Sequence, residues 1–365
     1  MRRKPLAAGL LMVLTMAVNS LAQIVPPRGV PNPPAWRALE ERRFAEAVLL
    51  FEAAARLAPR DASLRFGAGV ANLMQGKNAD ARRAFEAALA IDPRLTDASV
   101  LLGVAFYRDG LLQDAIKAYE SALRYAPDAS QLTGPLEKWR KEVSTEGQFY
   151  QAQGAHFTVF FEGPADDAAA QRALEILEDA YWRIGRELAI YPQRPLSVVL
   201  YTSEQFRDVT RSPEWASGVY DGRIKVPMGG QIESITDLRR VLEHELVHAM
   251  VASVAGPTVP AWLNEGLATA LEPGGSEWAA AQLQSSPARV PLAQLTRGFG
   301  ALATVQARAA YAQSALAVKS LLDQQGADKV VGLLQAVGRG VPFGEAFRQS
   351  ISTTLDEFAA EFASR

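Results

Sequence analysis

The chain has 365 residues, 48% of them hydrophobic, which is enough to bury a sizeable core and favours two domains over one. The formal net charge is −2 and the charged residues are interspersed, so the composition gives no indication of a nucleic-acid ligand. Cysteine is absent, which excludes disulfide bonds and a lipid-modified N-terminal cysteine, so the folded chain must be stable through its core alone.

The first residues resemble a secretory signal peptide. Residues 2–4 are basic, an apolar run extends from Leu6 to Val18, and small residues precede a cleavage site at Ala22. We expect residues 1–22 to be removed by cleavage after Ala22, which places the mature protein in the periplasm or outside a bacterial cell. The alternative is an uncleaved anchor, although the run is shorter than the roughly 20 residues that cross a bilayer. No later segment is apolar enough to predict a transmembrane span.

Residues 23–34 hold five prolines in twelve positions, which predicts a semi-rigid, extended linker. From residue 35 the composition changes to alanine-rich helix, and a period of 34 residues begins. The positions that recur at this period carry proline, glycine, alanine or an aromatic residue: Pro59, Pro93 and Pro127; Gly69 and Gly103; Gly76 and Gly110; Ala81 and Ala115; Phe51, Phe85 and Tyr119.

This pattern resembles the tetratricopeptide repeat, in which two short helices meet through small residues and proline ends the second helix. The resemblance predicts an all-α solenoid over residues 35–147, with three repeats and a capping helix at 134–146. The first repeat has Arg42 where the others have glycine. Stacked repeats form a concave groove, so we expect them to bind the substrate or a partner protein; the alternative is a spacer without a ligand.

Residues 148–365 show a different pattern, with predicted strands first and helices afterwards. In chain order we expect a strand at 155–163, a long amphipathic helix at 166–190, a buried strand at 195–201, a hairpin at 217–228 and helices over 234–365. The hairpin prediction rests on Asp221-Gly222, a dipeptide typical of type I′ turns. Pro227 favours an edge position for the second hairpin strand, where an extended peptide could join the sheet. These elements predict an α+β domain.

Two of the three histidines lie four residues apart, with a glutamate between them. A helix over 237–253, capped by Thr236, would place the imidazoles of His244 and His248 on one face, which suits a tetrahedral zinc ion. Glu245 lies beside them, where it can accept a proton from bound water. The other residues of this helix are largely apolar, and such a helix rarely carries three titratable groups without a function. The alternatives are a satisfied core cluster or a polar surface face.

A second helix is predicted to begin at Pro260 and to stop at Pro273. The pair of histidines, followed by Trp262-x-x-Glu265-Gly266-x-Ala268, resembles the gluzincin metallopeptidases, in particular the small bacterial peptidase MA-like domains. The resemblance covers residues 150–365, and both motifs of the family are present.

The resemblance implies a zincin-like α+β fold over residues 148–365. It implies that His244, His248 and Glu265 are ligands of a Zn²⁺ ion and that Glu245 is the general base. In this chemistry zinc lowers the pKa of water toward about 7, and the glutamate moves a proton from that water to the leaving amine. Packing of the second helix against the first through Gly266 is also implied.

Two further residues follow from the comparison with the family pattern. Better-known gluzincins have an aspartate four residues after the glutamate ligand, where it orients a zinc-binding histidine; here that position is Thr269, a weaker neutral partner. Related domains carry Tyr-x-x-Ser in a later helix, which makes Tyr311 the candidate donor to the oxyanion; the alternative is a packing tyrosine. The third histidine, His156, starts the first predicted strand and is expected to be structural.

The sequence therefore predicts a secreted zinc peptidase that hydrolyses peptide or protein substrates, with repeats that bring in the substrate or a partner. Two alternatives stay open. One is an interaction protein in which a metal-binding domain is weakly active or inactive. The other is a metal-dependent hydrolase for a bond other than a peptide bond, such as a cell-wall cross-link.

Overall fold

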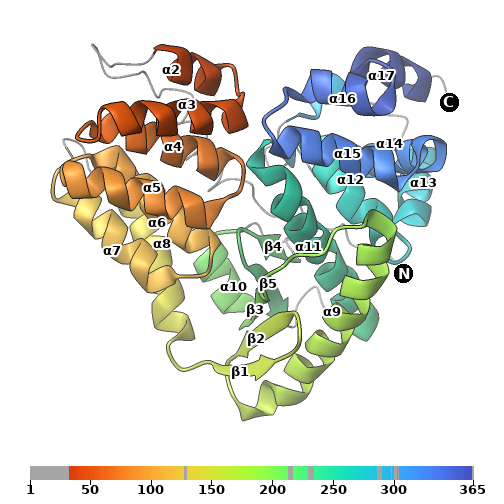
Figure 1. Ribbon diagram of the computed structural model, residues 1–365. Helices are drawn as coiled ribbons and strands as arrows, with labels where there is room; N and C mark the ends of the chain where they lie inside the picture. Colours follow the sequence, from red (N-terminus) through yellow and green to blue (C-terminus); the bar gives the residue numbers. More distant parts are fainter. Residues whose placement is uncertain are drawn as a thin grey trace.

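The computed structural model describes residues 33–126, 130–212, 217–228, 234–285, 290–296, 298–299, 302 and 304–363. The predicted signal peptide, and the predicted linker as far as residue 32, lie outside the described residues. The last two linker residues, Pro33 and Pro34, instead begin the first helix. Figure 1 places the repeats on one side, the helical C-terminal half on the other, and the sheet below and between them.

The N-terminal part consists of paired antiparallel helices. They are α2 (Pro33–Glu40), α3 (Phe44–Leu57), α4 (Ala62–Met74), α5 (Asn78–Ile91), α6 (Thr96–Arg108) and α7 (Leu112–Leu123). These helices form three consecutive pairs, and a further helix, α8 (Ser130–Glu146), begins four residues before the predicted capping helix.

Small residues and aromatic rings fit together inside the repeats. A Cβ atom added to Gly69 would lie 2.5 Å from the ring of Phe85, and one added to Gly103 would lie 2.5 Å from the ring of Tyr119. Both rings are buried. The two glycines and the two rings are equivalent positions of the period, so the second and third helix pairs are closed by the same contact of an aromatic ring with a glycine.

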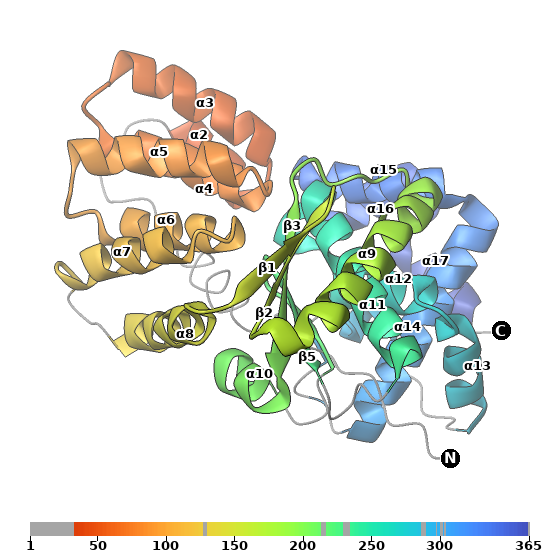
Figure 2. The ribbon, with the colours of Figure 1, turned by 90° about the horizontal axis from the view of Figure 1, so that it is seen from below.

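A five-stranded mixed sheet follows the repeats. Its strands are β1 (Tyr150–Gln153), β2 (Phe157–Phe161), β3 (Leu196–Thr202), β4 (Val219–Tyr220) and β5 (Ile224–Met228). Their order is β1-β2-β3-β5-β4, with parallel inner pairs and antiparallel outer pairs. The helix α9 (Asp167–Leu188) connects β2 to β3, and α10 (Ser203–Thr210) follows β3. Figure 2 shows the sheet between the repeats and the C-terminal helices.

The hairpin forms where it is predicted, but its turn differs. Tyr220 pairs with Ile224, so the connection has three residues, and within it only Gly222 has a positive φ, of 111°. A type I′ turn needs positive φ at both central residues. Here the carboxylate of Asp221 is held in a buried ion network that fixes the turn in another shape. The edge prediction is also wrong for the start of β5, because β4 pairs with it at Lys225.

The C-terminal helices complete the domain. They are α11 (Ile235–Ala255), α12 (Ala261–Leu271), α13 (Gly275–Ser285), α14 (Thr304–Gln325), α15 (Ala327–Gly338), α16 (Phe343–Ile351) and α17 (Leu355–Ala363), with short 3₁₀ turns at Pro164–Asp166, Gly256–Thr258 and Leu292–Gln294. One hydrophobic core runs from the sheet and α9 through α11 and α12 to α17.

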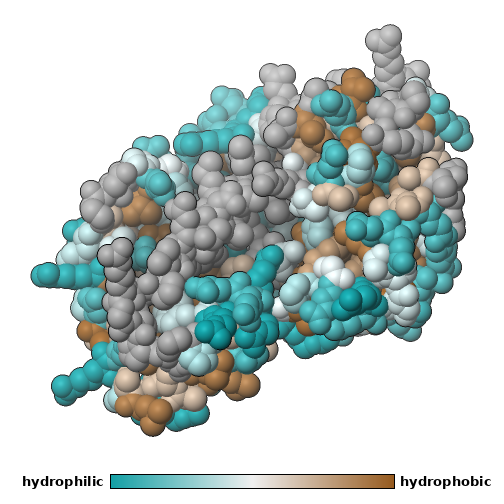
Figure 3. All heavy atoms as spheres, turned by 90° about the horizontal axis from the view of Figure 1, so that it is seen from above, coloured by the Kyte–Doolittle hydropathy of each residue, from teal (hydrophilic) through white to brown (hydrophobic). Residues whose placement is uncertain are grey.

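None of the helices in the described ranges combines the length and the apolar character needed to cross a bilayer. On the face that Figure 3 shows, hydrophilic residues predominate and hydrophobic ones form small scattered patches.

Candidate metal centre

The helix α11 lies in the middle of the C-terminal core and carries both histidines. Ser234, rather than the expected Thr236, caps it by accepting a hydrogen bond from the backbone N–H of Asp237. The helix packs against α9, α12 and β5. Because both histidines are four residues apart on a buried helix, their rings lie one above the other, with centroids 4.9 Å apart.

The helix α12 brings the third candidate ligand, Glu265, to the histidines. The sequence predicts that Gly266 of α12 packs against α11, but the structure differs. A Cβ atom added to Gly266 would lie 2.5 Å from the backbone oxygen of Ser314, so the glycine faces α14. The missing side chain lets α12 and α14 approach closely, and this fixes the depth of Glu265 in the core.

Three ligand atoms converge. Oε2 of Glu265 lies 3.6 Å from Nε2 of His244 and 3.5 Å from Nε2 of His248. These distances are too long for strong hydrogen bonds, and this buried oxygen has no hydrogen-bond partner within the described part of the chain. Ligands at 2.0–2.1 Å around a tetrahedral zinc ion lie about 3.4 Å apart. The three residues therefore fit a zinc ion, and each is buried.

The partner that orients His244 is a residue that the sequence did not suggest. Nδ1 of His244 lies 2.9 Å from Oε2 of Glu272, at the C-terminal end of α12. The carboxylate takes the place that was expected for Thr269, which is buried on the same helix but is not the partner of this ring nitrogen. Nδ1 of His248 is buried and has no hydrogen-bond partner among the residues that the structure describes.

The carboxylates of the site favour positive charge beside them. Burial alone would lower the pKa of His244, but Glu265 and Glu272 raise it to about 10. Burial alone would raise the pKa of Glu265, but the imidazoles of His248 and His244 lower it to about 2. A divalent cation bound here would supply positive charge of the kind that these carboxylates stabilise, which agrees with the ligand geometry.

Glu245 is buried at the centre of the site, under the start of the hairpin. Burial, more than any neighbouring charge, raises the pKa of Glu245 to about 7. A Cβ atom added to Gly218, the residue before β4, would lie 2.7 Å from Oε1 of Glu245. The backbone at Gly218 therefore lies directly against the carboxylate, a contact that no local sequence pattern predicts.

Tyr311 reaches the same site from α14. Burial first, and then the charges of Glu265 and Glu245, raise the pKa of Tyr311 well above its ordinary value, which reflects how close the hydroxyl lies to these carboxylates. The hydroxyl is buried and makes no hydrogen bond within the described ranges, and the ring packs edge-on against Phe299, with centroids 5.1 Å apart. The geometry leaves a hydroxyl donor near the three ligands.

His156 lies away from these residues, as expected. Its Nδ1 is 2.6 Å from Oε2 of Glu178, and its ring stacks on Tyr181 with centroids 3.8 Å apart. These contacts account for His156 by ring packing and by a hydrogen bond with Glu178.

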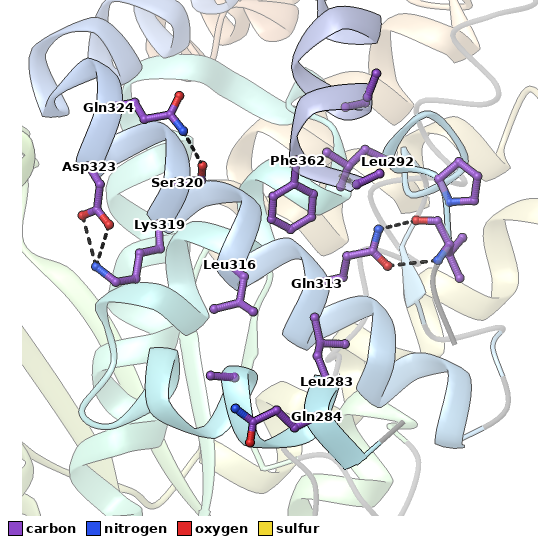
Figure 4. Close-up of a pocket in the computed structure, with 16 residues that line it drawn as sticks. Leu283, Gln284, Leu292, Gln313, Leu316, Lys319, Ser320, Asp323, Gln324 and Phe362 are labelled. Carbon is purple, nitrogen blue, oxygen red and sulfur yellow. Dashed lines mark hydrogen bonds and ion pairs between the residues drawn. The ribbon is translucent and has the colours of Figure 1, made fainter. Parts of the chain in front are cut away.

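A cavity of about 830 Å³ lies beside the site without belonging to it. Figure 4 shows Gln313, Leu316 and Ser320 of α14 lining it, together with Leu283 of α13 and Phe362 of α17. On a helix of 3.6 residues per turn, these α14 positions lie opposite to the face that carries the tyrosine of the site. The helix α14 therefore separates the cavity from the candidate metal centre.

Comparison with known protein families finds a match in each of the two parts of the chain. Models of the tetratricopeptide repeat match residues 35–96 and 75–130, and the model of the Peptidase MA superfamily matches residues 177–360, just over half of the chain. No curated protein matches the chain. Repeats of this kind point to protein interaction, and the second match points to a protease-like domain. The chain belongs to the Peptidase MA superfamily, and tetratricopeptide repeats precede its protease-like domain.

Proposed function

We propose that the protein is a zinc-dependent peptidase of the gluzincin type. One observation carries the proposal: a buried carboxylate oxygen of Glu265, which accepts no hydrogen bond from the described residues, faces Nε2 of both His244 and His248 at 3.5–3.6 Å. Without an ion, this buried oxygen receives no hydrogen bond from the described residues, which is unfavourable. With zinc it becomes a complete set of protein ligands with room for a fourth ligand.

In the proposed mechanism each residue has a separate task. His244, His248 and Glu265 hold the ion, and Glu272 keeps the ring of His244 in the orientation that turns Nε2 toward the ligands. Zinc held here supplies the Lewis acidity that activates a water molecule and polarises a peptide carbonyl. Glu245 accepts the proton of the attacking water and passes it to the leaving amine. The Tyr311 hydroxyl donates a hydrogen bond to the developing oxyanion.

The direct test is digestion of an unbiased peptide mixture by the chain from Gln23 onward, analysed by mass spectrometry. The Glu245→Gln variant is the matched control, because it keeps the shape of the side chain and removes the base. We expect cleavage by the parent only. Equal cleavage by both proteins would overturn the assignment of Glu245.

A second candidate function is a metal-holding interaction protein without turnover. It is favoured by the burial of the site, since Glu245 is only 3% exposed and the backbone at Gly218 covers it. This candidate predicts bound zinc and no cut peptide. A single cleavage event that depends on Glu245 excludes it.

We further propose that the protein is exported and acts in the periplasm or outside the cell. The support is the basic start of the chain, the apolar run from Leu6 to Val18 and the small residues before Gln23. Sequencing the N-terminus of the protein recovered from its source cells tests this. A start at Gln23 is expected, and an intact Met1 in the cytoplasmic fraction would contradict it.

A further inference from the structure

The repeats contact the protease-like domain along one edge. This edge is formed by the turns inside the repeats, where Arg42, Gly76 and Gly110 have φ values of 60°, 73° and 74°. Each turn lies at a glycine of the other domain. The contacts are Arg42 with Gly340, the Met74–Gly76 turn with Gly256, and Arg108 with Gly222. Because these glycines have no side chain, the two backbones touch directly.

The third of these contacts leads into a network of buried charges. Nζ of Lys225, on β5, lies 2.7 Å from Oε1 of Glu142 on α8, and both side chains are fully buried. Arg223 lies 3.0 Å from the same carboxylate and 2.8 Å from Glu146. Asp221 lies 3.1 Å from Nζ of Lys138, also on α8. Every one of these pairs joins the hairpin to the last helix of the repeat array.

Tyr107 of α6 lies at the centre of this network. Its hydroxyl is 2.7 Å from Oδ2 of Asp221 and 2.7 Å from Nζ of Lys225. A hydroxyl has one proton, so it donates to Asp221 and accepts from Lys225. One side chain of the repeats therefore bonds a residue of the hairpin turn, Asp221, and a residue of strand β5, Lys225. This part of α6 and α8 is buried against the hairpin, so it is not free to receive another protein.

The charges balance only when the two domains are together. The repeat side contributes one cation and two anions, a net charge of −1: Lys138, Glu142 and Glu146. The hairpin contributes two cations and one anion, a net charge of +1: Asp221, Arg223 and Lys225. Separating the domains would leave buried charges without partners on both sides, which is strongly unfavourable.

The same hairpin forms a wall of the candidate metal centre. Lys225 pairs across the strands with Val219, the residue directly after Gly218. The backbone at Gly218 in turn lies against the Glu245 carboxylate. A contiguous path of bonded or touching groups therefore runs from the repeats through the hairpin to the proposed base.

We propose that the repeat array positions the β4–β5 hairpin over Glu245, and that Tyr107 is the positioning residue that joins the two domains. This inference rests on the proposed peptidase function. It makes the repeats part of the active-site structure, in addition to any partner they bind. Loss of the Tyr107 hydroxyl should loosen the hairpin and lower turnover while the metal ligands stay in place.

The test compares Tyr107→Phe with Tyr119→Phe in the full chain. Both tyrosines are buried in the repeats and both rings contact Trp139, but only Tyr107 bonds the hairpin. Hydrogen–deuterium exchange is measured on peptides that cover residues 217–228, and kcat and KM are measured on a cleaved peptide. For Tyr107→Phe we expect exchange in the hairpin to be faster by about tenfold or more, because the hydroxyl's hydrogen bonds to two charged groups, Asp221 and Lys225, are lost.

We also expect kcat to fall in Tyr107→Phe with the zinc content unchanged, and Tyr119→Phe to match the parent in both measurements. Equal exchange in the hairpin of the two variants would overturn the positioning role. If the parent cleaves no peptide, the peptidase assignment fails, and the exchange measurement alone tests the positioning role. Faster hairpin exchange in Tyr107→Phe would then still support that role. Unchanged hairpin exchange would overturn it.

Discussion

Nδ1 of His244 lies 2.9 Å from Oε2 of Glu272, and both side chains are buried. In this arrangement Nδ1 donates a hydrogen bond to the carboxylate, which turns Nε2 toward Glu265, where it would bind a metal ion. The contact also ties the middle of α11 to the end of α12. The two helices that carry the candidate ligands are therefore held together by an interaction that itself orients one ligand.

The first prediction concerns Glu272. Because loss of an orienting carboxylate weakens metal binding, Glu272→Gln should lower zinc affinity about 10–100-fold. A competition titration with a chromophoric chelator measures this. Thr269→Val, a change of similar size at the position first expected to orient the histidine, should leave the affinity unchanged. The assignment would be wrong if the threonine variant lost affinity and the glutamine variant did not.

The second prediction concerns the contact between α12 and α14. Gly266→Ala places a methyl group against the Ser314 backbone, so it should destabilise the fold by about 1–3 kcal/mol. Gly332→Ala is the control, because Gly332 is inside α15 and nothing lies within 4 Å of its added Cβ. That change should stabilise the protein by about 0.5–1 kcal/mol. Denaturant unfolding measures both, and shifts of the same sign would contradict the close approach.

The third prediction concerns pH. Burial alone would raise the pKa of Asp221, but Lys225 and Lys138 hold it below its ordinary value. The stability that this carboxylate contributes is complete above about pH 4, its pKa in an unfolded chain, and is lost as the pH falls toward the lower folded-state pKa. Asp221→Asn should therefore cost about 3–5 kcal/mol at pH 7 and less at pH 3.

Urea unfolding at both pH values checks this prediction. Asp208→Asn is the control, because Asp208 pairs with Lys141 at 3.5 Å on the surface and should contribute less than about 1 kcal/mol. A difference between parent and Asp221→Asn that stays constant from pH 7 to pH 3 would show that the network does not depend on the Asp221 charge.

The fourth prediction concerns Tyr311. If its hydroxyl stabilises the oxyanion, Tyr311→Phe should lower kcat about 100-fold or more, with little change in KM or zinc content. Steady-state kinetics on a cleaved peptide, together with metal analysis of the same sample, separate these effects. A packing role predicts instead an unchanged kcat and a lower melting temperature.

Much of the framework of the site could be predicted from local sequence pattern. The position of the histidines on α11 follows from helical spacing within a buried, largely apolar segment. The place of Glu265 follows from its motif on α12. These features depend on residues close together in the chain, and local spacing is what a sequence displays directly.

The contacts between distant segments could not be predicted. Glu272 meets His244 across 28 residues, and Tyr107 meets Lys225 across 118. In the sequence, Lys225 resembles an outward-facing strand residue between the apolar Ile224 and Val226. Its burial depends on how the repeats dock on the sheet, and no local period encodes that. The turn at Asp221 differs from the expected type for the same reason.

In the proposed site, Glu265 binds zinc and Glu245 acts as the general base. Zinc content after dialysis, measured on the parent and on Glu265→Gln and Glu245→Gln, tests these roles with the same chemical change at two positions. We expect about one zinc per chain in the parent and in Glu245→Gln, and much less in Glu265→Gln. Full zinc content in Glu265→Gln, or loss of zinc in Glu245→Gln, would show that the roles of the two glutamates are wrongly assigned.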